Sequence, residues 1–144
     1  MEIQGYNMPD DLHYHEENTW VKLEDDGTVR VGMDDFYQKQ AGETTYIDMP
    51  FEGDTVSQGE TCGKIQSSKW VGKLVSPISG EIVEVNSELE SDCRLINNDS
   101  YGAGWIMKIK PSNLEEELKN LAHGPEVLEK FIQDHIDKAG RGGE

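Results

Sequence analysis

The stretch CGKIQSSKWVGKLVSPISGEIVEVN (62–86) predicts the fold, because short apolar runs alternate along it with turn signals. Two strand-like runs meet at 67–70, and Ser-Pro and Ser-Gly pairs separate the second run from a third. Lys69 falls at the tip of the predicted tight turn, where Asn, Asp or Gly would be more usual. A primary amine on a flexible stem suits a lysine that an enzyme acylates, and an ordinary solvated turn lysine is the alternative.

The chain up to residue 111 has the same turn-rich β character. Strands are predicted at 19–33, where a DDGT turn joins a hairpin, at 44–50, around Val56 and at 105–111. Helical spacing of apolar residues predicts a short helix over 34–42, with Asp34 as its N-cap and Gly42 as its end. The segment 87–104 is predicted to be a loop.

Beyond residue 111 the pattern becomes helical. Ser112 and Glu115 have the spacing of a capping box, and Pro125 opens a second predicted helix. The second helix carries an apolar stripe, predicted to pack against the sheet, of Val127, Leu128, Phe131, Ile132 and Ile136. These features predict a helical pair over 112–138.

The fold class predicted from these elements is mostly β, a sandwich or flattened barrel of antiparallel strands with a short inserted helix and C-terminal helices. The expected organisation is an N-terminal extension (1–11), a β domain (12–111), the helical pair (112–138) and a flexible tail (139–144). The sequence contains no dinucleotide-binding, phosphate-loop or nucleophile-elbow motif, so nothing in it predicts an enzyme.

The composition limits the partners. With 13 basic and 29 acidic residues the net charge is −16, which disfavours nucleic acid and anionic membranes as partners. No apolar run reaches the ~20 residues of a membrane span, and the N-terminus lacks the basic and apolar regions of a signal peptide. A cytoplasmic monomer is expected.

The cysteines and histidines do not predict a catalytic or metal site. Cys62 and Cys93 lie outside any CxxC or Cys/His cluster, so two reduced thiols are expected, with a disulfide or redox role as the alternative. His13 and His15 share a face of a strand without a third ligand at suitable spacing, and no metal site is predicted.

Three segments, in register, resemble the glycine cleavage system H protein family. They are YHEENTWVKLEDDGTVRVGMDDFYQ (14–38), GETTYIDMPFEGDTVSQGETCGKIQSSKWVGKLVSPISGEIVEVNSEL (42–89) and LINNDSYGAGWIMKIKP (95–111). The resemblance covers about 12–130 and implies a lipoyl-domain barrel-sandwich of two antiparallel sheets. It also implies that lipoic acid is attached covalently to Lys69, flanked by Ser68 and Trp70. Lys64 and Lys73 then become strand lysines, with Lys73 the second choice if the turn is shifted.

The resemblance implies a carrier with no catalysis of its own. A lipoyl arm can be reduced, can hold a substrate fragment and can be reoxidised by a flavoprotein. The expected partners include a lipoate–protein ligase or lipoyl transferase, which would attach the arm. A glycine cleavage carrier would also serve glycine decarboxylase, aminomethyltransferase and dihydrolipoamide dehydrogenase.

The sequence departs from the family pattern around the lysine. Gln66 replaces an acidic residue, Trp70 replaces a small one, and Asn18-Thr19 replaces the usual His-Glu. Trp70 could form an apolar wall for the arm or simply pack the turn. These changes are closer to the H-like lipoate-binding proteins of the sulfur-oxidising heterodisulfide-reductase-like pathway. A carrier of a sulfur intermediate serving that complex is therefore the main prediction; a glycine cleavage carrier and an unmodified scaffold are the alternatives.

Overall fold

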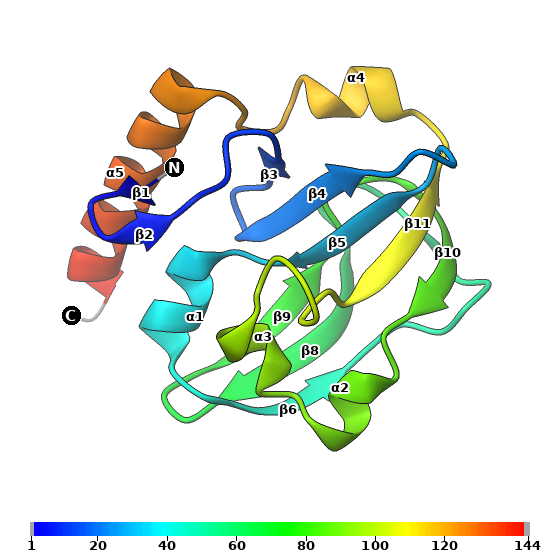
Figure 1. Ribbon diagram of the computed structural model, residues 1–144, viewed down its shortest axis with the longest axis horizontal. Coiled ribbons are helices and arrows are strands. Elements are labelled where there is room, and N and C mark those ends of the chain that lie inside the picture. Colours follow the sequence, from blue (N-terminus) through cyan, green and yellow to red (C-terminus); the bar gives the residue numbers. More distant parts are fainter. Residues whose placement is uncertain (1, 143–144) are drawn as a thin grey trace.

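Two antiparallel sheets face one another and enclose the core (Figure 1). The computed structural model describes residues 2–142, with side chains through residue 138. The six-stranded sheet has the order β3 (His13–Tyr14), β4 (Thr19–Leu23), β5 (Val29–Met33), β11 (Met107–Pro111), β10 (Gly80–Val85) and β7 (Thr55–Val56). The three-stranded sheet has the order β6 (Thr44–Asp48), β8 (Thr61–Ser67) and β9 (Val71–Val75). The predicted β class, the two antiparallel sheets and the 19–33 hairpin are confirmed.

Within residues 2–142, five helices and a short hairpin surround the sheets. The helices are α1 (Asp35–Ala41), α2 (Glu88–Ser91), α3 (Leu95–Asn98), α4 (Leu114–Leu118) and α5 (Pro125–Gly142), and the hairpin pairs β1 (Glu2–Ile3) with β2 (Tyr6–Asn7). In Figure 1, α5 lies beside the β1–β2 hairpin at one side of the molecule, whereas α2 and α3 lie near β6.

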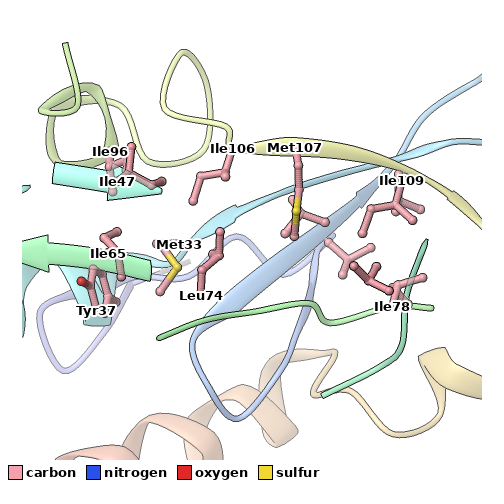
Figure 2. Packing of buried hydrophobic residues seen from close by; sticks show 14 of the residues in the cluster. Met33, Tyr37, Ile47, Ile65, Leu74, Ile78, Ile96, Ile106, Met107 and Ile109 are labelled. Carbon is pink, nitrogen blue, oxygen red and sulfur yellow. The ribbon is translucent and has the colours of Figure 1, made fainter. Parts of the chain in front are cut away.

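The main core is built from the inward-facing side chains of both sheets. Figure 2 shows Ile65 of β8 and Leu74 of β9 near Met33 of β5 and Met107 of β11. All four side chains are at most 1 % exposed. Because alternate residues of a strand point to opposite faces, this burial fixes which side chains point outward.

A second core cluster joins α5 to the N-terminal segment and to Trp20 of β4. Leu128 and Ile132 of α5 are fully buried in it, together with Met8. Trp20 lies over Gly32, where a Cβ would come within 2.7 Å of the indole, and its Nε1 donates a hydrogen bond of 3.0 Å to the carbonyl of Ser100. The apolar stripe of α5 therefore packs chiefly on the N-terminal segment and the edge of the large sheet.

One member of that stripe was predicted wrongly. Val127 is 51 % exposed, because it lies towards the solvent side of the helix instead of in the second cluster.

Two further sequence predictions need correction. The predicted 87–104 loop contains α2 and α3, each a single turn. The Ser112–Glu115 capping box is absent: Asn113 precedes α4 without a side-chain cap, and it is Glu117 that accepts hydrogen bonds, from the backbone and hydroxyl of Ser79.

The end of the chain also differs from the expected tail. The helix α5 continues to Gly142, past the predicted end of the helical pair at 138. The last two residues of the predicted tail, 143–144, lie outside the described residues.

The predicted N-cap of α1 is confirmed. Asp34 accepts a hydrogen bond of 2.8 Å from the backbone N–H of Tyr37 and one of 3.1 Å from the Asn18 amide. Gly42 ends the helix with φ +80°. Burial raises the pKa of the Asp34 carboxyl to about 7, and these hydrogen bonds only partly offset that rise.

Replacing Asp34 with Asn should reveal this titration. The native pKa of about 7 lies above the ordinary value of 3.8, so between these pH values the folded protein holds a proton that the unfolded chain has released. The contribution of Asp34 to stability should therefore be largest below about pH 4, fall as the pH rises to about 7 and then level off. In urea unfolding, the free energy of unfolding of the wild type should fall by on the order of a few kcal/mol relative to that of Asp34→Asn as the pH rises from about 4 to about 7. A wild type that gains stability relative to the variant would contradict this.

Candidate functional site

The turn between β8 and β9 presents Lys69 at its tip. The strands pair antiparallel with Gln66 opposite Val71, and the turn spans Ser67 to Trp70. The backbone N–H and the hydroxyl of Ser67 donate to the Trp70 carbonyl at 2.8 and 3.1 Å. Lys69 is exposed, and no hydrogen bond or ion pair joins its ammonium group to another described residue. Hydrogen bonds therefore restrain the backbone of this turn, while the Lys69 ammonium group is open to solvent.

The turn is also held from outside by the segment that follows α1. The backbone N–H of Ser68 donates to the Glu43 carbonyl at 2.9 Å. The Asn97 side chain of α3 secures this segment, because it donates to the Gly42 carbonyl at 2.7 Å and accepts from the Thr44 N–H at 2.8 Å. No local sequence pattern indicates this role of Asn97, although the residue lies in one of the three segments that resemble the family.

Glycine is required at position 42. Its φ of +80° suits glycine, and a Cβ there would lie 2.6 Å from the Ser68 hydroxyl. The same Cβ would lie 3.7 Å from the stem of Lys69, so the absence of a side chain lets the turn and the lysine stem approach α1.

A pocket of about 350 Å³ opens beside the turn. It is lined by Asn18, Phe36, Tyr37, Gln40, Ala41, Lys69 and Trp70. Trp70 is 51 % exposed, and its ring meets that of Tyr37 edge-on with a centroid distance of 5.6 Å. The indole also folds over Gly72, where a Cβ would come within 2.4 Å of it. Trp70 therefore both packs the hairpin and forms one wall of the pocket.

The pocket has aromatic and polar lining residues, and one of them, Tyr37, carries an unsatisfied hydroxyl. The hydroxyl of Tyr37 is buried and has no hydrogen-bond partner among the residues that the structure describes. Burial raises the pKa of this phenol, so it stays protonated. The pocket thus offers aromatic surface and no buried charge beside the Lys69 side chain.

The structure separates the other two candidate lysines from the turn. Lys64 on β8 and Lys73 on β9 lie directly opposite one another and are exposed. Their side chains point away from the core, on the face opposite Ile65. Neither is at the turn or lines the pocket.

The cysteines are free thiols, as expected. Cys62 donates to the Leu74 carbonyl at 3.5 Å, and burial raises its pKa to about 12, which makes it a poor nucleophile. Within residues 2–142 the structure shows no cluster of three or more His, Cys, Asp or Glu side chains suited to a metal ion. None of the described helices is long and apolar enough to cross a bilayer.

Comparison with known proteins gives a consistent result. The family described as "Glycine cleavage H-protein" matches residues 12–135. A Pyrococcus abyssi protein named "Probable glycine cleavage system H protein" is 43% identical over 129 residues, covering 90% of this chain and 96% of that protein. The "Glycine cleavage system H protein" of Mycobacterium tuberculosis is 43% identical over 104 residues, covering 72% and 78% of the two chains.

A solved structure extends the likeness to three dimensions. The crystal structure of a glycine cleavage system H protein from Mycobacterium marinum superposes with a TM-score of 0.68 at 37% identity, covering 73% of this chain and 87% of that chain. The chain therefore belongs to the glycine cleavage H-protein family, whose members carry lipoic acid covalently attached to a lysine.

Proposed function

We propose that this protein is a lipoyl-lysine carrier whose arm is attached at Lys69. The observation that carries the proposal is the free, exposed ammonium group of Lys69 at the tip of a turn whose backbone is held on both sides. A rigid base with a mobile stem lets one tethered group visit several active sites at high effective concentration. Residues 12–111 would form the carrier unit, with the C-terminal helices packed on it.

The pocket beside Lys69 fits the apolar part of such an arm. Its walls include Phe36, Ala41 and Trp70, and the lysine stem already passes over Gly42 towards it. When bound, the lipoyl group supplies thiol–disulfide chemistry. The chain's own residues supply the attachment point, a resting surface and the orientation of the arm.

The cargo that we propose is the aminomethyl group of glycine. The named relatives support this interpretation better than the main sequence prediction, a sulfur intermediate for a heterodisulfide-reductase-like complex, because they are called glycine cleavage system H proteins. The partners would then be glycine decarboxylase, aminomethyltransferase and dihydrolipoamide dehydrogenase. A cytoplasmic monomer that carries but does not catalyse stays our prediction.

Incubating the lipoylated protein with glycine and the decarboxylase of the source organism tests the cargo. An aminomethyl increment in the intact mass supports the proposal. A protein that stays unloaded with glycine but gains sulfur mass with the heterodisulfide-reductase-like complex would reverse it. A chain bare at Lys69 in cells that lipoylate their other carriers would indicate a scaffold.

The attachment site is tested by Lys69→Arg. This substitution keeps the positive charge but removes the primary amine, so we expect no lipoyl increment in the intact mass. Lys64→Arg and Lys73→Arg are matched controls on the same hairpin. Both should be modified within about twofold of the wild-type rate, as surface substitutions away from the reacting atom usually have small effects. Loss of modification in Lys73→Arg with retention in Lys69→Arg would overturn the assignment.

The resting place of the arm is tested through Trp70. If the arm lies in the pocket, attachment should shield the half-exposed indole, and the tryptophan emission should shift to shorter wavelength. Trp70→Phe should lose that shift, because neither of the other two tryptophans, Trp20 and Trp105, lines the pocket. Identical wild-type emission before and after lipoylation would show that Trp70 only packs the turn.

A further inference from the structure

The outer face of the three-stranded sheet differs in charge from the rest of the molecule. Acidic residues make up 29 of 144 positions, about one in five, yet residues 61–80 contain none, and the same segment carries Lys64, Lys69 and Lys73. This segment is the hairpin that presents Lys69, together with the turn that follows it. A positively charged hairpin therefore stands on a chain of net charge −16.

Strand register places specific side chains together on this face. Tyr46, Gln66 and Val71 form one cross-strand row, and Asp48, Lys64 and Lys73 form the next row away from the turn. Residues two apart on a strand share a face, so both rows point the same way. The intervening row, Ile47, Ile65 and Gly72, faces the core, which confirms that these two rows face outward.

The face is apolar near the turn, and the row behind it carries two lysines and one aspartate, Lys64, Lys73 and Asp48. Tyr46 is 50 % exposed and Val71 is 59 % exposed, so two large apolar side chains lie open beside the Lys69 turn. Lys64 and Lys73 stand opposite one another without an ion-pair partner among the described residues. Asp48 lies opposite Lys64 on its other side, so one carboxylate stands against two ammonium groups, and the row keeps a net positive charge of one.

We propose that this outer face, hereafter the Tyr46–Lys73 face, is the docking surface for the enzyme that loads the arm onto Lys69, and that this enzyme presents an acidic surface beside its active site. The inference rests on the proposed function. The loading enzyme must bring its active site to the bare amine, whose stem is shorter than the finished arm, so it has to cover the strands next to the turn. The other side of the hairpin is occupied by Trp70, α1 and the arm pocket.

Charge complementarity explains how such an enzyme would be oriented. An acidic partner is repelled by most of this chain and attracted by the hairpin, so electrostatics steers it to the face that leads to Lys69. The apolar pair Tyr46 and Val71 would then be desolvated in the centre of the contact, where aromatic side chains contribute most to binding. This attraction acts over about 8 Å at physiological ionic strength and weakens as salt is added.

The test is the kinetics of lipoylation of the full-length apo protein by the purified lipoylating enzyme of the source organism. We expect Lys64→Glu/Lys73→Glu to lower kcat/KM about tenfold or more, mainly through KM, because the steering charge is reversed. The neutral variant Lys64→Gln/Lys73→Gln should have a kcat/KM between those of the wild type and the Glu variant. Its kcat/KM should also depend much less on salt concentration. The control is Lys22→Glu/Lys110→Glu, which replaces exposed lysines on β4 and β11 of the other sheet and changes the net charge equally. Its kcat/KM should stay within about twofold of the wild-type value.

Other outcomes overturn the inference. Equal effects of the two Glu pairs would mean that only net charge matters, and unchanged lipoylation would mean that the enzyme docks elsewhere. A defect confined to decarboxylase-dependent loading of protein already lipoylated would assign the face to a later partner. A wild-type dimer that the Lys64→Glu/Lys73→Glu pair dissociates, seen by sedimentation, would assign it to a second copy of this chain. Failure of the proposed carrier function can be distinguished from failure of this docking inference, because in the first case the wild-type protein would accept no lipoyl group at Lys69 at all.

Discussion

Burial of Ile65 in the closed core between the two sheets is the constraint on which the rest of the site depends. The side chain is fully buried and pairs across the strands with Ile47 on one side and Gly72 on the other. A slip of one residue would turn Ile65 outward and bring lysines into the core, so the register of β8 against β9 is strongly specified. That register puts the turn at Ser67–Trp70 and therefore puts Lys69 at the tip.

The same register gives the hairpin two sides with different properties. On the inner side Gly72 leaves room for the Trp70 indole, which reaches Tyr37 and closes the pocket beside the lysine. On the outer side the Tyr46–Lys73 face stays open. A carrier has to be loaded by one enzyme and has to present its arm to others. A turn with the proposed resting surface on one side and the proposed docking surface on the other would meet both needs.

The turn is stabilised by residues from distant parts of the sequence. Asn97 of α3 holds the segment between α1 and β6, and the carbonyl of Glu43 in that segment accepts the N–H of Ser68. The cap of α1 by Asp34 sets where that helix begins, and Gly42 sets where it ends. The backbone at Lys69 is thus held while its ammonium group has no partner among the described residues, and an arm attached there, as we propose, would have a fixed pivot.

The sequence by itself determined the β class, the 19–33 hairpin, both ends of α1 and the position of Lys69 at a turn, because each follows from local alternation, turn chemistry or capping. It did not determine which residues support that turn. Asn97 lies 53 positions from Thr44 and pairs with it only because the fold brings α3 to the start of β6. Nor did local pattern reveal that Glu117 would hydrogen-bond to Ser79, because the two residues lie 38 positions apart and meet only in the folded chain. The pocket, its Trp70 wall and the outer charged face likewise arise from strand register and packing, and these are decided when the whole core closes.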